Sequence, residues 1–170
     1  MFRLFLSLAA TVVLGFSAFA QDAVKPGPEH ELLKKHVGTW TTTMSAGGMD
    51  AKGSVTFKME LGGLWLIGDM QSELFGMKFN GKSMDSYDQA KKKYVSVWAD
   101  SMSTGPVITE GTYNPEKKTL TMTGEGPGMD GKTSKYKSVT EFKDDDTFIM
   151  TMYMGDTKEA SFVVTYKRKK

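Results

Sequence analysis

The sequence predicts an all-β protein: an antiparallel barrel of about ten strands with one short helix near the N-terminus. After Gly38 the apolar side chains recur with a period of two, which is typical of half-buried strands. Short turn-like segments separate these stretches at intervals of about 8–12 residues, the spacing of an all-β sandwich or barrel. Short turns between consecutive strands favour an up-and-down arrangement. No strand–helix–strand alternation occurs, which excludes a doubly wound nucleotide-binding fold.

Residues 1–20 have the layout of a secretory signal peptide. Arg3 precedes an apolar run over residues 4–15, and the segment ends at Ala18-x-Ala20, so we expect cleavage before Gln21. An uncleaved membrane anchor is the alternative, but the run is short for a bilayer core of about 30 Å. No cysteine follows it, which excludes a lipoprotein anchor. We therefore expect export to the bacterial periplasm or the extracellular medium, with no stable membrane anchor after cleavage.

Composition excludes several functional classes. The chain has no cysteine, so disulfides, iron–sulfur clusters, thiolate zinc sites and cysteine nucleophiles are ruled out. Its 22 Lys and Arg nearly balance its 20 Asp and Glu, and the two signs are interspersed. This pattern gives no electrostatic footprint for nucleic acid. Composition leaves the oligomeric state open.

The chain divides into the signal peptide, a linker over residues 21–27 and a single domain over residues 28–170. The linker is polar and runs into Pro26-Gly27-Pro28. A helix is predicted over residues 28–37, because proline and acidic residues begin this segment, Lys and His end it, and Gly38 follows.

The predicted strands alternate clearly at several points. Between residues 54 and 61, Val55, Phe57, Met59 and Leu61 share one face. Asn80-Gly81 lies inside another predicted strand, where it indicates a bulge or a tight turn. The predicted strands span residues 39–46, 54–61, 64–71, 77–87, 94–101, 107–113, 119–123, 134–142, 147–154 and 160–168.

The junction between the helix and the first strand carries a Gly-x-Trp motif, Gly38-Thr39-Trp40. It resembles the opening of lipocalins and related calycin barrels. That resemblance implies that the tryptophan closes one end of the barrel and that a basic residue of the last strand packs over its ring. Arg168 is the candidate partner of Trp40, because it shares strand parity with Phe162, Val164 and Tyr166. A tryptophan at the edge of the core with a solvated tail is the alternative.

A closer resemblance covers nearly all of the chain after the signal peptide. Its motifs include Val37-Gly38-Thr39-Trp40, Leu61-Gly62-Gly63-Leu64-Trp65, Ser86-Tyr87-Asp88, residues 93–102 and Glu125-Gly126-Pro127. They resemble a bacterial family catalogued as domain of unknown function 1579. This resemblance implies a calycin-like (lipocalin-like) β-barrel. It implies no established activity and no catalytic residues.

The sequence offers no metal, phosphate or cofactor site. His30 and His36 are six residues apart, on roughly opposite sides of a helix, so they do not form a chelating pair. Asp144-Asp145-Asp146 lacks the spacing of a calcium loop. Gly124-x-Gly126-x-Gly128 has no following helix and is interpreted as a loop rather than a phosphate cradle.

No catalytic constellation is recognised either. Gly-x-Ser-x-Gly is absent, and a serine triad would need a histidine of the N-terminal helix to meet a strand serine. An acid pair would require Asp69, Asp85 and Asp100 to converge in a barrel mouth. We therefore assign no catalytic residues and expect a binding protein rather than an enzyme.

Of the 13 methionines, 12 remain after signal cleavage, and many of these fall on predicted strand faces that also carry aromatic residues. Methionine suits surfaces that accept varied apolar partners, and a barrel of this strand number has room for one small ligand. Tyr94, Ser96, Trp98 and Asp100 share one face that mixes aromatic and polar groups. We therefore predict binding of a small apolar or amphipathic molecule in the interior. The candidate lining residues are Phe57, Met59, Leu66, Trp98, Met122, Met150 and Met152.

Three alternatives stay open at this stage. A filled core with an exposed apolar patch would make the chain an interaction or structural module. A Cu(I) site could form from Met150, Met152 and Met154, which alternate along one strand. An enzyme would require titratable residues to converge in the cavity.

Overall fold

The computed structural model describes residues 24–74, 76–128 and 130–170. The predicted signal peptide and the first residues of the predicted linker lie outside this range. Residues 24–27 have no regular secondary structure and lead directly into the helix α1.

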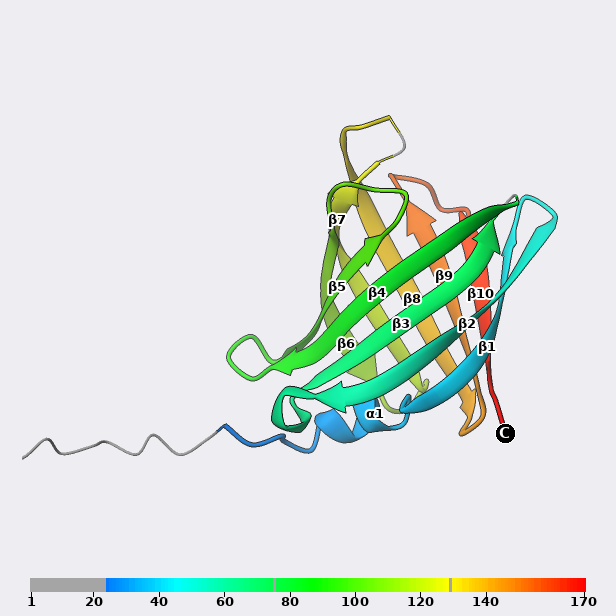
Figure 1. Ribbon diagram of the computed structural model, residues 1–170. Helices are drawn as coiled ribbons and strands as arrows, with labels where there is room; N and C mark the ends of the chain where they lie inside the picture. Colours follow the sequence, from blue (N-terminus) through cyan, green and yellow to red (C-terminus); the bar gives the residue numbers. More distant parts are fainter. Residues whose placement is uncertain (1–23, 75, 129) are drawn as a thin grey trace, which may run out of the picture.

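Ten antiparallel strands form one closed barrel, which confirms the prediction of an all-β barrel of about ten strands with one short helix (Figure 1). Each strand pairs with its neighbours in the chain, and β1 pairs with β10 to close the ring. Closure leaves no open sheet edge along the paired strands. The elements are α1 (His30–Lys34), β1 (Gly38–Ala46), β2 (Met49–Glu60), the 3-10 turn η1 (Leu61–Gly63), β3 (Trp65–Leu74), β4 (Met77–Asp88), β5 (Lys93–Asp100), β6 (Val107–Asn114), β7 (Thr119–Pro127), β8 (Thr133–Asp144), β9 (Thr147–Met154) and β10 (Phe162–Arg168).

Several elements differ from the sequence prediction, and three of these differences bear on the interior of the barrel or its ends. The helix is half the predicted length, because the chain tightens into i→i+3 hydrogen bonds from His36 and Val37 as soon as it leaves Lys34. Strand β7 extends through the glycine-rich segment that was interpreted as a loop. Strand β4 pairs in continuous register through Asn80-Gly81, so the prediction of a bulge or a tight turn there was wrong.

Gly81 has a packing role rather than a turn role. It does not adopt the left-handed conformation of a tight hairpin turn, and a Cβ atom on it would lie 2.3 Å from the Trp98 ring. The absence of a side chain therefore lets the indole of β5 lie flat against β4.

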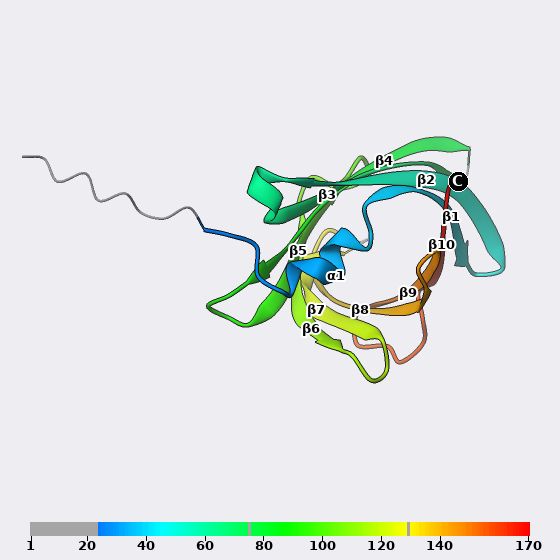
Figure 2. The ribbon, with the colours of Figure 1, turned by 90° about the horizontal axis from the view of Figure 1, so that it is seen from below.

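The two ends of the barrel differ. Helix α1 lies across one end, together with the turns that follow β2, β4, β6 and β8 (Figure 2). The opposite end carries the other hairpin connections and no helix (Figure 1). We call these the closed end and the open end. Within the described residues, no helix has the length and apolar character to cross a bilayer.

The hydrophobic core fills the closed half of the barrel. Trp40 is only 1% exposed, and its ring meets Phe148 edge-on with centroids 4.8 Å apart. Phe148 in turn stacks on Tyr166 at 4.2 Å. Leu32 and Leu33 of α1 pack against this aromatic cluster and join the helix to the barrel.

Arg168, the last residue of β10, ties the closed end together. Its guanidinium carbon lies 4.1 Å from the centre of the Trp40 ring. The same group donates hydrogen bonds to the carbonyls of Val37 at 2.7 Å and Lys35 at 2.8 Å, just beyond α1. It also donates to the Asp145 carbonyl and the Asp146 carboxylate in the β8–β9 turn. One side chain therefore connects the last strand, the first strand, the helix exit and a turn.

The Gly-x-Trp motif has a physical explanation in this arrangement. Gly38 adopts a φ of +125°, which side chains disfavour, and a Cβ atom there would lie 2.9 Å from the Arg168 guanidinium. Two residues later, the Trp40 indole N–H donates to the His36 carbonyl at 2.7 Å. Glycine thus admits the arginine, and tryptophan provides the surface that it covers.

His36 is enclosed by aromatic rings in the same core. Phe57, Phe142 and Phe148 each meet its imidazole edge-on, with centroids 5.0–5.9 Å away. Burial lowers the pKa of His36 to about 4 despite its hydrogen bond with the Leu32 carbonyl. The ring is therefore neutral at physiological pH, with Nδ1–H donating to that carbonyl.

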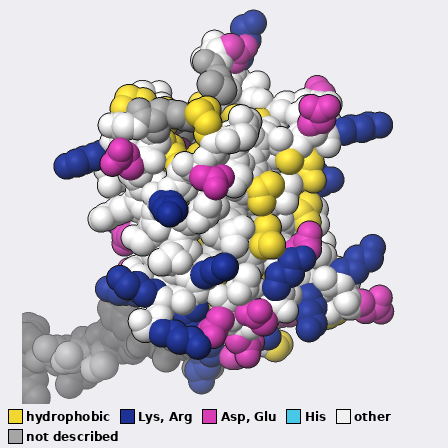
Figure 3. Space-filling model, turned by 90° about the vertical axis from the view of Figure 1, so that its right-hand side faces the viewer, with side chains coloured by type: hydrophobic (Ala, Val, Ile, Leu, Met, Phe, Trp, Pro, Cys, Tyr) yellow, Lys and Arg dark blue, Asp and Glu magenta, His cyan; other side chains and the backbone are white. Residues whose placement is uncertain are grey.

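The outer surface is polar and of mixed charge. Figure 3 shows Lys and Arg interspersed with Asp and Glu over one side of the barrel, with apolar side chains gathered in patches between them. This is the surface expected from the near balance of positive and negative residues in the sequence.

We predict that Arg168→Lys lowers the free energy of unfolding by about 2–3 kcal/mol, because a lysine cannot reproduce the forked set of charged hydrogen bonds. Urea denaturation followed by tryptophan fluorescence measures the change. Lys167→Arg, at the outward-facing neighbour, is the control and should alter stability by less than about 0.5 kcal/mol. Equal effects of the two substitutions would contradict the role of the guanidinium.

The low pKa of His36 predicts acid sensitivity. Between pH 6.5 and pH 4 the unfolded chain binds a proton at this position and the folded chain does not, so the free energy of unfolding should fall as pH falls. The total loss should be about 3 kcal/mol. In His36→Leu this pH-dependent loss of the free energy of unfolding should disappear. Urea titrations at pH 7.5, 6.5, 5.5 and 4.5 measure the difference between the two proteins. Parallel pH profiles of the two proteins would show that His36 is not the group responsible.

Candidate functional site

The barrel interior is the candidate functional site. On each strand every second side chain points inward. The residues paired across neighbouring strands show which of the two alternating sets faces the interior. We call the interior between the closed-end core and the open end the lumen.

Three of the predicted lining residues belong to the packed core. Phe57, Leu66 and Met122 face inward but are no more than 9% exposed and contact the closed-end cluster. They form the floor of the lumen. Met59 and Met150 are partly buried and pack against this core.

Trp98 and Met152 occupy a different position. Both face inward and stay partly exposed, and neither belongs to the core cluster. Trp98 lies against Gly81 and stacks beside Phe79, with centroids 6.3 Å apart. Met154 continues the inward row of β9 toward the open end. The predicted candidates thus divide into a tightly packed floor and a looser wall.

The lumen also has a polar zone that the lining prediction did not include. Asp85 faces inward from the middle of β4, and the Ser83 hydroxyl donates to its Oδ2 atom at 2.8 Å. Ser96, directly opposite on β5, is a second hydrogen-bond partner. Burial raises the pKa of the Asp85 carboxyl, and these hydroxyls offset the rise only in part. Ser138 and Thr140 add buried hydroxyls on β8.

The three aspartates considered as an acid pair do not converge. Asp69 points outward and forms an ion pair with Lys82 on the barrel surface. Asp100 accepts a hydrogen bond from the Trp98 indole at 2.8 Å and another from the Met102 backbone at 2.9 Å. It therefore fixes the indole, whereas Asp85 lies deeper on the neighbouring strand.

Two hairpins diverge at the open end and leave a pocket. Strands β2 and β3 stop pairing at Gly53 and Ser72, while the β1–β2 and β3–β4 hairpins each continue for several residues. A pocket of about 420 Å³ lies in this fork. Its volume falls within the range typical of small-molecule sites. Its lining residues are Met44, Ala46, Met49, Asp50, Ala51, Glu73 and Gly76.

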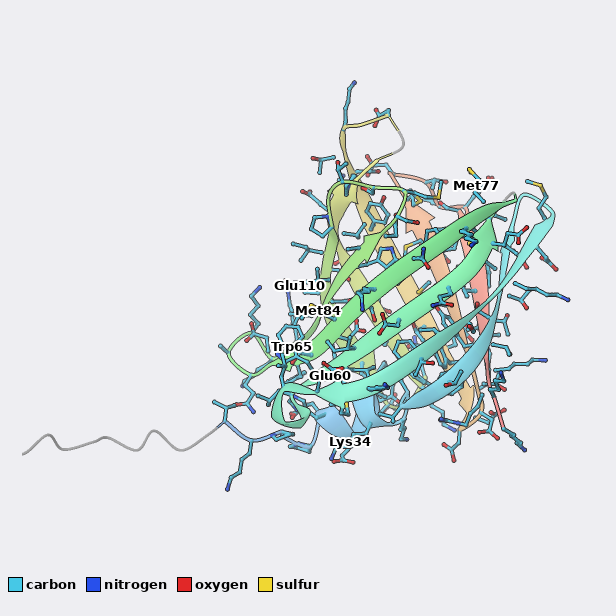
Figure 4. All side chains as sticks on the ribbon, viewed as in Figure 1. Lys34, Glu60, Trp65, Met77, Met84 and Glu110 are labelled. Carbon is cyan, nitrogen blue, oxygen red and sulfur yellow. The ribbon has the colours of Figure 1, made fainter. Side chains whose placement is uncertain are left out.

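Methionines are exposed around the same end. Met49 and Met77 are each 56% exposed and Met102 is 63% exposed. Figure 4 labels Met77 at the open end of β4 and Lys34 on α1 at the closed end. Flexible thioether side chains at an opening suit the entry of apolar molecules of varied shape.

A smaller pocket of about 160 Å³ lies outside the closed end, between α1 and the β6–β7 and β8–β9 turns. It includes His36, Lys118 of the β6–β7 turn and Lys143 of β8, and its volume is below the range typical of ligand sites. Among the described residues, no group of three or more His, Asp or Glu side chains could hold a metal ion. Met150, Met152 and Met154 share the inward face of β9.

Comparison with protein families gives one assignment. Residues 25–168 match the family described as Protein of unknown function (DUF1579). The chain belongs to this family. The family's description carries no activity that could be transferred to the site. No curated protein matches the chain significantly.

Several solved structures share the barrel shape at low similarity. A de novo designed fluorescence-activating β-barrel is 10% identical, with a TM-score of 0.48, and the match covers 81% of this chain and 96% of the design. A redesigned β-barrel is 14% identical (TM-score 0.45, 81% and 95% covered). Another, bound to the dye DFHBI, is 13% identical (TM-score 0.45, 79% and 99% covered).

The hydroxyl partners of Asp85 could have been found from strand parity. Phe79, Gly81, Ser83, Asp85 and Tyr87 alternate along β4, but interpreting Asn80-Gly81 as a turn interrupts that series. Once β4 is continuous, the series places an acid and a small hydroxyl on the inner wall. What the sequence could not supply is the absence of a cationic partner across the barrel.

We predict that Asp85→Asn stabilises the protein at pH 7.5 by on the order of 1 kcal/mol, because it removes an unpaired enclosed charge. Because the pKa of Asp85 is higher in the folded protein, the carboxyl ionises more readily in the unfolded chain. This carboxyl therefore lowers the free energy of unfolding increasingly as pH rises above about 4. The gain should therefore shrink toward pH 4. Thermal unfolding at both pH values measures it, with the exposed Asp69→Asn as control. Destabilisation by Asp85→Asn at pH 7.5 would refute this account.

Proposed function

We propose that the barrel binds a small apolar or amphipathic molecule in its lumen, entering through the open end. One observation carries the proposal: inward-facing side chains of the open half, among them Trp98 and Met152, keep partial solvent exposure inside a closed ring of strands. In a filled barrel these positions would be as buried as Leu66 and Val164, which are 2% and 3% exposed.

The distribution of side chains supports this function. The floor is apolar and rigid, the middle wall combines aromatic and hydroxyl groups, and the rim carries exposed methionines. Ligand sites are mostly apolar with a few placed polar groups, which is the composition of this lumen. Ten strands also enclose a wider interior than eight, the number at which barrels begin to hold one small ligand.

A second candidate function is protein interaction through the outer wall. Ile67, Met84, Val97 and Ile108 lie in register across β3–β6 and point outward. Met84 is 40% exposed and Ile108 is 55% exposed. A row of apolar side chains on a sheet surface favours contact with another protein. This function does not need the lumen and would survive its obstruction.

We further propose a calycin-type barrel and an exported protein. The calycin assignment is supported by the Gly38–Trp40 motif and by Arg168 over the Trp40 ring. Export is supported by the sequence of residues 1–20, which ends in Ala18-x-Ala20.

Blocking the lumen tests the proposed binding. N-phenyl-1-naphthylamine, a neutral apolar dye that becomes fluorescent in apolar sites, is titrated into the protein. Met152→Trp places bulk inside the barrel and should weaken dye binding about tenfold, on the order of 1.4 kcal/mol. Thr151→Trp, its outward-facing neighbour on β9, is the matched control and should leave binding unchanged. No saturable dye binding by the wild type, or equal weakening by both substitutions, would count against a lumen site.

A further inference from the structure

The lumen differs from the outer surface in its charge. The strand lysines point outward, and none lies on an inward-facing position of the described strands. Two carboxylates, Asp85 and Asp100, do face inward. Arg168 also faces inward, but its guanidinium lies at the closed end and is engaged by Asp146. The outward lysines are Lys52, Lys58, Lys78, Lys82, Lys93, Lys135, Lys137 and Lys167.

Neither inward carboxylate has a cationic partner among the described residues, and Asp85 is the deeper of the two. Its side chain faces into the ring of strands and the residue retains partial exposure, so part of Asp85 borders accessible space in the lumen. Ser83 and Ser96 satisfy part of its hydrogen-bonding capacity. A carboxylate has about four acceptor positions, and no ion pair among the described residues includes Asp85. It therefore retains acceptor capacity, and no cation among the described residues pairs with it.

The buried tyrosines and histidines of the barrel provide no cation for Asp85. Burial raises the pKa of Tyr94 to about 12 and raises the pKa of Tyr166 still further, so both phenols stay protonated and neutral. His36 is neutral and occupied with the Leu32 carbonyl. His30 is buried at the closed end beside Tyr87, where its Nδ1 accepts a hydrogen bond from the Gly27 backbone.

The wall above Asp85 suits a cation as well. The Trp98 indole lies against Gly81, which is two inward positions from Asp85 toward the open end of β4, and its N–H donates to Asp100. This places a fixed aromatic ring on the inward face of the wall, and aromatic rings attract ammonium and guanidinium groups at their π-faces. Asp100 adds negative charge at the entrance.

We propose that the ligand of this barrel is a cationic amphiphile, whose N–H-bearing head group pairs with Asp85 while its apolar part contacts Trp98 and Met152. This inference rests on the proposed lumen function and narrows it to one charge class. An ammonium or guanidinium group supplies both the charge and the donors that Asp85 lacks. An anionic head group would meet two inward-facing carboxyl groups and, within residues 24–74, 76–128 and 130–170, no free inward-facing cation.

Three ligands of one chain length test the proposal: decylamine, decanol and decanoate, each displacing N-phenyl-1-naphthylamine at pH 7.5 and at concentrations below micelle formation. Wild-type protein should bind decylamine about tenfold more tightly than decanol, and decanoate most weakly. Asp85→Asn should abolish the preference for the amine while leaving decanol binding intact. Asp69→Asn removes an outward carboxylate of the neighbouring strand and should keep the full preference. Thermal unfolding verifies that each variant is folded.

The possible results separate the inference from the function on which it rests. If all three ligands bind the wild type equally, or if Asp85→Asn keeps the preference for decylamine, the cationic ligand class is wrong and lumen binding stands. If neither the dye nor any of the three ligands binds, the lumen function itself is wrong. Loss of the preference in Asp69→Asn as well would assign it to the general surface charge and overturn the role of Asp85.

Discussion

The packing of Arg168 over Trp40 is the interaction on which the rest of the structure depends. It joins the two strands that close the ring and connects them to the helix exit and the β8–β9 turn. The guanidinium satisfies carbonyls that would otherwise be unpaired near the end of α1, where a cation is also favoured by the helix dipole. Gly38 makes the approach possible by lacking a side chain.

Most of the tightly packed core lies at the closed end, so the open end can carry side chains that do not stabilise the fold. The aromatic cluster around Trp40, Phe148 and Tyr166 lies at the closed end with α1. The open half is lined by a looser mixture of side chains, which includes the partly exposed Trp98 and Met152. An enclosed carboxylate such as Asp85 weakens the fold rather than supporting it. Residues that cost stability inside an otherwise regular barrel point to function.

Much of the fold could be predicted from the sequence, because alternation and turn spacing report directly on strands. The family motifs and the parity of Arg168 also indicated which residues would meet at one end. The exceptions were local. Asn80-Gly81 has the composition of a turn, but Gly81 accommodates the Trp98 ring within a straight strand. The 28–37 segment has the pattern of a longer helix, but it must turn within a few residues to deliver Gly38 to β1.

The candidate site was less predictable, for a physical reason. Whether methionines such as Met150 and Met152 fill a core or line a cavity depends on barrel width and on the residues facing them from several strands, which no single stretch of sequence reports.

The central claim is that the lumen above Phe57 and Leu66 holds open space. Crystals of the protein pressurised with xenon test it most directly, because xenon occupies open apolar space. The account predicts xenon inside the barrel beside Trp98 and Met152. An interior without xenon, closed by its own side chains, would contradict it.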